Sequence, residues 1–223
     1  MPEVIFAGPE GRLEGRYQKG RGDNPPVALI LHPHPLFGGT MNNRATYEMY
    51  HLFARKGFSV LRFNFRGVGR SQGEYDQGQG ELADAATALD YLQSMNANAP
   101  FAWVAGFSFG AWISMQLLMR RPEIAGFISA SAAANLFDFS FLAPCPSSGI
   151  VIHGEADKIC RPEETKAMVE RTRTQKGRKI EFTVLPEADH FFEEKIDDFV
   201  ALAENYLDQR LAYPQPEGPY IEP

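Results

Sequence analysis

The segment GFSFG at residues 106–110 constrains the fold more strongly than any other part of this sequence. It fits the pattern Gly-x-Ser-x-Gly, with an apolar run at 101–105 before it and a helix-length apolar segment at 111–119 after it. Glycines without Cβ atoms let a strand turn sharply into a helix, and Ser108 between them then lies at the tip of the turn. The pattern predicts a strand-turn-helix unit that presents the Ser108 hydroxyl beside a helix N-terminus.

The rest of the chain alternates short apolar runs with segments of helical periodicity. After a hairpin near the N-terminus, this alternation predicts an α/β fold with a mostly parallel sheet of about 7–8 strands and helices on both faces. Ligands bind to such sheets at the carboxyl ends of the strands. Strands are expected at 4–6, 13–17, 27–31, 58–65, 101–105, 126–131, 150–153 and 180–185. Helices are expected at 45–53, 82–92, 111–119, 162–177 and 196–207.

Length and composition predict one globular domain. The 223 residues are 44% apolar and 22% charged, which is typical of a folded α/β chain. We expect residues 1–212 to form this domain and the Pro-rich segment 213–223 to form a tail, which could also pack on a second copy in a homodimer. The segment 132–148 is long enough to contribute a lid but too short for a separate cap domain.

The charge and the N-terminus argue against several classes of partner. A net charge of −6 gives no electrostatic case for nucleic acid or for anionic membranes. The sequence has no signal-peptide pattern and no apolar run near the roughly 20 residues that cross a bilayer. Its two cysteines, Cys145 and Cys160, suggest neither a disulfide framework nor a zinc site. We therefore expect a cytoplasmic protein without a metal or another cofactor.

A serine hydroxyl needs a base beside it, and the base needs a group that holds its tautomer. In chains built on this turn the serine comes first, the acid second and the histidine last. Only His153 and His190 of the five histidines follow Ser108. His153 shares its segment with the best candidate acid, and His190 directly follows the last expected strand. His190 is therefore the predicted base.

Several carboxylates compete for the role of the acid. Asp157 is the predicted acid because it follows the strand at 150–153 by a few residues and can reach across the top of the sheet. Glu155 and Asp138 are the alternatives in nearby loops. Asp189 adjoins His190, and neighbouring residues rarely present side chains in the required geometry. We expect Asp189 to order its own loop through a hydrogen bond from the backbone.

A tetrahedral intermediate on Ser108 would need two N–H donors for its oxyanion. The N–H of Phe109, directly after the serine, is the first predicted donor, and the loop after the strand at 27–31 should supply the second. Pro33 and Pro35 have no N–H, which leaves His34, Leu36 or residues beyond. We select Leu36. His34 could instead polarise substrate or water, or hold the loop through its ring.

Aromatic residues gather in the loops near the expected active-site end of the sheet. Some belong to the core, and others are candidates for an apolar pocket that binds a small acyl substrate. The candidate pocket residues are His34, Phe37, Phe107, Phe137 and Phe191.

Five segments together resemble the α/β-hydrolase superfamily. They are HPHPLFGGTMNN at 32–43, NFRGVGRS at 64–71, GFSFG at 106–110, HGEAD at 153–157 and ADHFF at 188–192. They are most similar to a small, capless bacterial branch near the dienelactone hydrolases. The resemblance implies a triad of Ser108, Asp157 and His190 and an oxyanion hole from Leu36 and Phe109. Dienelactone hydrolases use cysteine where this chain has Ser108, so lactone specificity is not implied.

These observations predict a serine hydrolase that cleaves a small carboxylic ester or a related acyl substrate through an acyl-enzyme on Ser108. One alternative keeps the enzyme but changes the bond to an amide, peptide or thioester. Related sequences include hydrolases similar to Xaa-Pro dipeptidyl-peptidases, although this chain lacks the extra domains of those peptidases. A second alternative is a non-catalytic scaffold that binds a ligand.

Overall fold

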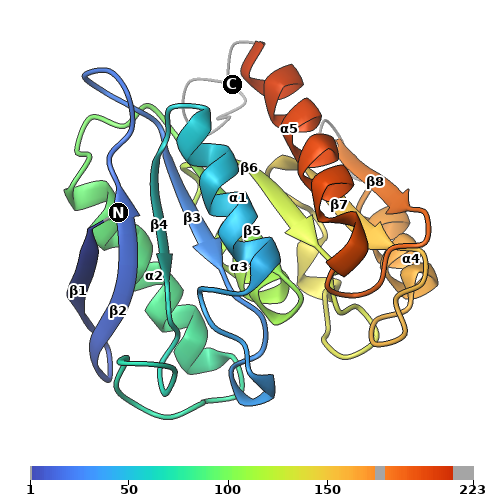
Figure 1. The fold of residues 1–223 in the computed structure, drawn as a ribbon, viewed down its shortest axis with the longest axis horizontal. Coiled ribbons are helices and arrows are strands. Elements are labelled where there is room, and N and C mark those ends of the chain that lie inside the picture. The colour runs from blue at the N-terminus through green and yellow to red at the C-terminus, as the bar shows by residue number, and fades with distance from the viewer. Residues whose placement is uncertain (1, 174–178, 213–223) are drawn as a thin grey trace.

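The computed structural model describes residues 2–173 and 179–212. Its strands form one sheet in the order β1-β2-β4-β3-β5-β6-β7-β8 (Figure 1). Neighbouring strands from β4 to β8 in this order are parallel, whereas β1 and β2 are antiparallel. The predicted mostly parallel sheet is therefore confirmed. The strands are β1 (Glu3–Gly8), β2 (Gly11–Gln18), β3 (Val27–Leu31), β4 (Ser59–Phe63), β5 (Ala102–Phe107), β6 (Ile124–Ala130), β7 (Ser148–Gly154) and β8 (Ile180–Leu185).

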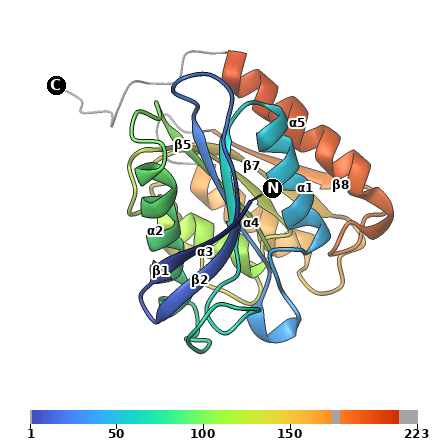
Figure 2. The ribbon, with the colours of Figure 1, turned by 60° about the vertical axis from the view of Figure 1, so that its left-hand side comes forward.

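The helices cover both faces of the sheet, as predicted. Helices α1 and α5 pack on one face, and α2, α3 and α4 pack on the other (Figures 1 and 2). The helices are α1 (Arg44–Arg55), α2 (Gln79–Ser94), α3 (Phe109–Leu118), α4 (Pro162–Arg173) and α5 (Ile196–Ala212), with short 3-10 turns η1 (Pro35–Phe37), η2 (Ser140–Leu142) and η3 (Glu193–Lys195). The predicted end of the fourth helix at Gly177 lies outside the described residues.

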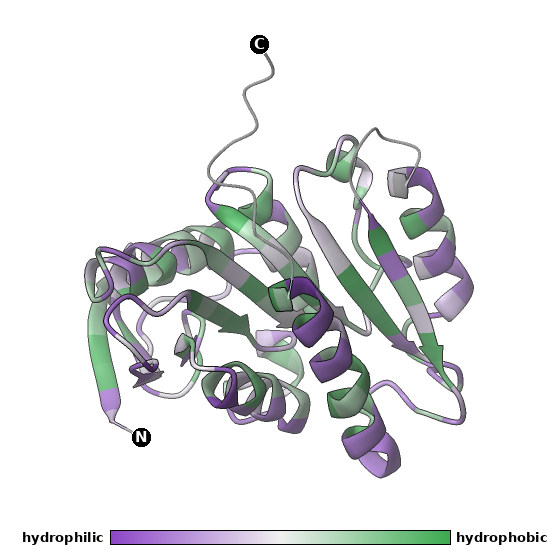
Figure 3. Cartoon of the chain, turned by 90° about the horizontal axis from the view of Figure 1, so that it is seen from above, coloured by the Kyte–Doolittle hydropathy of each residue, from purple (hydrophilic) through white to green (hydrophobic). Residues whose placement is uncertain are grey.

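The central strand β5 is buried on both faces. Val104 packs into the core under α2 and α3, whereas Trp103 and Ala105 pack into the core under α1 and α5. Alternate side chains of a strand point to opposite faces, so a strand covered on both sides must be apolar throughout. Figure 3 shows hydrophobic residues concentrated in the strands, while the helices carry both kinds. This burial fixes the strand from which the serine turn extends.

The turn after β5 requires its two glycines. A Cβ at Gly106 would lie 2.2 Å from the Gly110 carbonyl oxygen, and a Cβ at Gly110 would lie 2.4 Å from the Leu31 carbonyl oxygen. Backbone atoms therefore occupy the space that any larger residue would need. Ser108 itself has φ 54° and ψ −113°, and a residue other than glycine rarely adopts such a positive φ. The chain enters α3 at Phe109, directly after the serine.

The segment 132–148 packs on the domain and forms no lid. Phe139 and Leu142 are buried in the core under α3, and the Trp112 indole N–H donates to the Asp138 carbonyl oxygen at 2.9 Å. These contacts fix the segment beside α3 instead of leaving it free to close over Ser108. The predicted tail at 213–223 lies outside the described residues.

We predict that Gly106→Ala destabilises the fold by about 3 kcal/mol or more, because its Cβ would overlap backbone atoms that cannot move aside. Gly22→Ala is the matched control, since Gly22 has a positive φ but no atom within 4 Å of an added Cβ. The control should cost only about 1–2 kcal/mol through its backbone conformation. Urea unfolding of the three proteins measures both differences. Equal stability of Gly106→Ala and the wild type would contradict the packing argument.

Candidate active site

Ser108, His190 and Asp157 form a continuous chain of polar contacts. The Ser108 Oγ lies 3.1 Å from His190 Nε2, and His190 Nδ1 lies 2.7 Å from Asp157 Oδ2. A carboxylate oxygen only accepts, so Nδ1 carries the hydrogen and Nε2 is left to accept the serine proton. All three side chains are buried or nearly so. The structure thus brings together the three residues that the sequence selected from different loops.

Two loops are drawn together to place Asp157 beside His190. The Ala156 N–H donates to the Ala188 carbonyl oxygen at 2.9 Å, between the loop after β7 and the loop after β8. A Cβ at Gly154 would lie 2.4 Å from that same carbonyl oxygen, which explains the glycine at the end of β7. The Ser131 hydroxyl donates to the His190 carbonyl oxygen at 2.9 Å. His190 is therefore held through its backbone as well as through its ring.

The Asp157 carboxylate accepts hydrogen bonds at both oxygens. The N–H groups of Ile159 and Cys160 donate to Oδ1, each at 2.8 Å. Burial alone would raise the pKa of Asp157, but the contacts from His153, His190 and the Cys160 N–H outweigh it and hold the pKa below its usual range. Asp157 is therefore ionised at neutral pH, as a group that orients a histidine should be.

The competing carboxylates are engaged elsewhere. Asp138 accepts hydrogen bonds from the backbone N–H and the hydroxyl of Ser140, within its own turn. Glu155 accepts from the Glu187 N–H at 3.1 Å. Asp189 accepts from the Glu193 N–H at 3.0 Å, which confirms the prediction that it orders its own loop.

The loop after β3 is anchored from beneath by His32. The buried His32 ring donates from Nδ1 to the Pro33 carbonyl oxygen at 2.6 Å, and its Nε2 accepts from the Phe65 N–H at 3.0 Å. Burial lowers the pKa of His32 to about 3, although the bond to Pro33 opposes this shift. Arg62 and Asn64 of the neighbouring chain segment bind the backbone of Met41. The loop that carries His34 is thus fastened to the carboxyl end of β4.

The predicted second oxyanion donor has a partner of its own. The Leu36 N–H donates to His34 Nδ1 at 3.2 Å, so the His34 side chain caps the short turn η1. Within residues 2–173 and 179–212, the N–H groups of His34 and Phe109 donate to no other group. Phe109 opens α3, so its N–H points out of the helix N-terminus.

The candidate pocket residues divide into exposed and buried ones. The His34 ring lies 4.7 Å from Phe37 and 4.9 Å from Phe109, and Phe37 is 84% exposed. Phe137 is half-buried and Phe191 is 39% exposed. Phe107 is fully buried with its ring centroid 5.2 Å from that of His190. Phe107 therefore supports the base from within the core and lines no open surface, contrary to the prediction.

Tyr75 and Trp112 also contact the candidate pocket residues, and the sequence pattern did not predict them. The Tyr75 ring lies 4.9 Å from that of His34, and Trp112 stacks on Phe137 at 4.6 Å. Both belong to segments that the sequence pattern described only as a loop and a helix. Trp112 stands four residues after Ser108, one helical turn away, and this spacing was the available signal.

The buried group Asp157, Cys160 and His190 could also hold a metal ion, since one ligand atom of each lies within 4.8 Å of the others. Both Asp157 oxygens and His190 Nδ1 are already engaged with one another or with backbone N–H groups. Burial raises the pKa of the Cys160 thiol to about 12, and nearby Asp157 adds to this, which disfavours the thiolate that a metal needs. The geometry fits a proton-transfer chain better than a metal centre.

The geometry agrees with comparisons to known proteins. The family model described as serine aminopeptidase, S33, matches residues 35–147, about half of the chain, including the serine turn. A protein of unknown function from Agrobacterium tumefaciens, described as a candidate α/β hydrolase, is 56% identical, with 100% of both chains covered and a TM-score of 0.93. The chain belongs to this family of α/β-hydrolases.

Two further proteins are similar to this chain at lower identity. An α/β serine hydrolase without a lid from Xanthomonas campestris is 29% identical, with 96% of both chains covered and a TM-score of 0.86. The lysophosphatidylserine lipase of Rattus norvegicus is 26% identical over 172 residues, which span 67% of this chain and 42% of the lipase.

Among the helices of residues 2–173 and 179–212, none combines the length and the apolar character that a membrane span requires.

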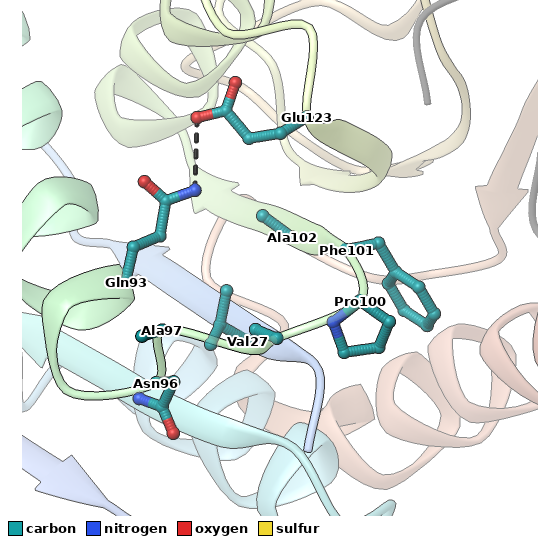
Figure 4. A pocket seen from close by; sticks show the side chains of 9 residues that line it. Val27, Gln93, Asn96, Ala97, Pro100, Phe101, Ala102 and Glu123 are labelled. Atoms are coloured by element: carbon teal, nitrogen blue, oxygen red, sulfur yellow. Dashed lines mark hydrogen bonds between the residues drawn. The ribbon is translucent and has the colours of Figure 1, made fainter. Parts of the chain in front are cut away.

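A separate pocket of about 190 Å³ lies at the opposite end of the sheet (Figure 4). Val27 and Ala102, which line it, are the first residues of β3 and β5, whereas Ser108 follows the carboxyl end of β5. The Gln93 amide donates to the Glu123 carboxylate at 3.1 Å within this pocket. Its distance from the serine turn separates it from the candidate active site.

The buried His32 should make the stability of this hydrolase depend on pH. The folded chain keeps His32 neutral down to about pH 3, whereas the unfolded chain binds a proton near its ordinary pKa of 6.5. The unfolded state therefore binds more protons between these values, and the free energy of unfolding falls as the pH falls through this window. Between pH 7 and pH 5 the contribution of His32 is about 2 kcal/mol.

His32→Gln tests this expectation, because an amide can donate to the Pro33 carbonyl and accept from the Phe65 N–H without titrating. Urea unfolding at pH 7 and pH 5 should show a smaller loss of stability for the variant, by about 2 kcal/mol. Equal losses for the variant and the wild type would contradict a neutral buried His32.

Proposed function

We propose that this protein is a serine hydrolase that cleaves a carboxylic ester or a related small acyl substrate through an acyl-enzyme on Ser108. The observation that carries the proposal is the aligned contact of Ser108 with His190 and of His190 with Asp157, at 3.1 Å and 2.7 Å. The strained φ of Ser108, at 54°, supports it, since such strain persists where surrounding structure holds a reactive group in place. Membership in a hydrolase family adds further support.

Each side chain has a defined role in the proposed reaction. His190 Nε2 takes the Ser108 proton as the oxygen attacks the acyl carbonyl, and it then gives this proton to the leaving alcohol. Asp157 holds the Nδ1–H tautomer and stabilises the imidazolium that forms between these steps. Water, activated by the same histidine, attacks the acyl group and releases the acid, which regenerates the serine.

The proposed oxyanion hole combines the Phe109 N–H with a second backbone donor from the loop after β3. The Leu36 N–H would have to leave His34 Nδ1 before it could take this role. The His34 N–H was an alternative among the residues that Pro33 and Pro35 leave open, and it has no competing acceptor within the described residues. We therefore assign the second donor to His34 in place of Leu36. The anchored His32 ring beneath would keep this donor fixed.

Exposed apolar side chains around the site favour a substrate with an apolar group. The loops after β3, β6, β7 and β8 each carry such a residue, within three positions of His34, Phe137, Asp157 or His190. The Asn135 amide donates to the Ile159 carbonyl oxygen at 3.2 Å, which places two of these loops side by side. A substrate that covers these side chains would remove apolar surface from water. We call this set the apolar rim: Leu36, Phe37, Leu136, Ile159 and Phe191.

Amide or peptide hydrolysis is the second candidate function. The description of the matched family as serine aminopeptidase favours it. A comparison of p-nitrophenyl esters with aminoacyl anilides separates the two candidates. The proposed location is the cytoplasm, and the low number of cysteines, both of them buried, supports a reducing compartment.

A fluorophosphonate probe tests the nucleophile. We predict covalent labelling of the wild type at neutral pH and none of Ser108→Ala, because the probe reacts with an activated serine. Asp157→Asn should label about 10⁴-fold more slowly, since the amide favours the wrong histidine tautomer. Mass spectrometry of the labelled peptide locates the adduct. An unlabelled wild type, or an adduct outside residues 102–118, would refute the proposed function.

The apolar rim should set a preference for longer acyl chains. We predict that Leu136→Ser and Ile159→Ser each lower kcat/KM for p-nitrophenyl octanoate by about fivefold, which corresponds to about 1 kcal/mol of lost apolar contact. Hydrolysis of p-nitrophenyl acetate should change less, because its acyl group is too short to reach the rim. Met95→Ser is the matched control, at 53% exposure beside the far end of the sheet. Equal effects on both esters would contradict a binding role for the rim.

A further inference from the structure

His153 stands beside Asp157 without being one of the three aligned residues. Its side chain is fully buried at the end of β7, four residues before Asp157. Its Nε2 lies 2.6 Å from the Cys160 carbonyl oxygen and 3.1 Å from Asp157 Oδ2. A carbonyl oxygen only accepts, so Nε2 carries the hydrogen and directs it toward both oxygens.

The second nitrogen of the same ring has no polar function. His153 Nδ1 is buried and has no hydrogen-bond partner in the part of the chain that the structure describes. A buried polar atom without a hydrogen-bond partner lowers the stability of the fold. If His153 served only to fill space, an apolar side chain of similar size would therefore fit the position at least as well. The Nε2–H is therefore the feature of His153 that needs an explanation.

The Nε2–H acts on both halves of the Asp157 carboxylate. It faces Oδ2, the oxygen that accepts from His190 Nδ1 at 2.7 Å. It also holds the Cys160 carbonyl, and the N–H of Cys160 is one of the two donors to Oδ1. One buried donor thus limits rotation of the carboxylate and closes the short loop that surrounds it.

We propose that His153 is a positioning residue that fixes the Asp157 carboxylate against His190. This inference rests on the proposed function of Ser108, Asp157 and His190. His153 touches neither Ser108 nor an open surface, so it acts on the reaction only through Asp157. The titratable groups that face Asp157 are His153 from β7, Cys160 from its own loop and His190 from the loop after β8.

A double-mutant cycle tests this role by the rate of fluorophosphonate labelling at Ser108. His153→Leu should lower the rate about 10- to 100-fold, as losses of partners behind a functional ligand commonly do. The same change in the Asp157→Asn background should lower it less than about threefold, because the group through which His153 acts is already altered. His153→Gln, which can offer an amide N–H near the position of Nε2, should recover most of the rate.

A general structural role predicts a different outcome. It would make the loss from His153→Leu equally large in both backgrounds, and that result overturns the proposal. A folded His153→Leu protein that labels at the wild-type rate also overturns it. Thermal unfolding of each variant shows whether it is folded, and His51→Leu, on the distant helix α1, is the control that should label normally.

A measurement without turnover separates this proposal from the proposed function. The His190 Nδ1–H bonded to the Asp157 carboxylate gives a far-downfield proton resonance, and its loss in both Asp157→Asn and His190→Gln distinguishes it from the resonance of the His153 Nε2–H. We expect His153→Leu to shift or broaden this resonance and His153→Gln to restore it. An unchanged resonance in His153→Leu overturns the positioning role even if Ser108 labels. A changed resonance in a protein that never labels refutes only the proposed function.

Discussion

The close approach of three backbone segments at the serine turn is the constraint on which the rest of the site depends. The end of β3, the end of β5 and the start of α3 meet where Gly106 and Gly110 leave no room for a Cβ. Because α3 begins this close to β3, Phe109 and the loop that carries His34 are neighbours, with the ring centroids of Phe109 and His34 4.9 Å apart. The glycines therefore determine the spacing of the proposed oxyanion donors as well as the tight turn that carries the serine.

The contact between Asp157 and His190 depends on a second close approach, between the loops after β7 and β8. Gly154 permits this approach, and the Ala156 N–H closes it through the Ala188 carbonyl. Ionised Asp157 is buried, and it is stable there because its oxygens accept N–H groups from the backbone and from two histidines. The charge on Asp157 is thus maintained by hydrogen bonds from the backbone and from the two histidines.

The sequence predicted the sheet, the helix faces and the three aligned residues because each follows from short-range pattern. Apolar runs mark the buried strands, and the order of Ser108, Asp157 and His190 limits the choice to a few loops. Contacts between loops were beyond such reasoning. The bond from the Leu36 N–H to His34 and the burial of Phe107 under His190 depend on side-chain directions in three dimensions. His153 was visible as part of HGEAD, but only its distance from Asp157 indicates a role.

The absence of a lid among the described residues changes how this site can select a substrate. Some side chains near the site are held rigidly, because Trp112 stacks on Phe137 and its indole N–H donates to the Asp138 carbonyl oxygen. Phe37, in contrast, is 84% exposed and contacts the His34 ring. Rigid side chains discriminate between substrates by shape, whereas an exposed side chain can turn to cover an apolar group that binds beside it. Discrimination between acyl groups by shape should therefore arise at Trp112 and Phe137, whereas Phe37 and the rest of the apolar rim should favour longer apolar groups in general.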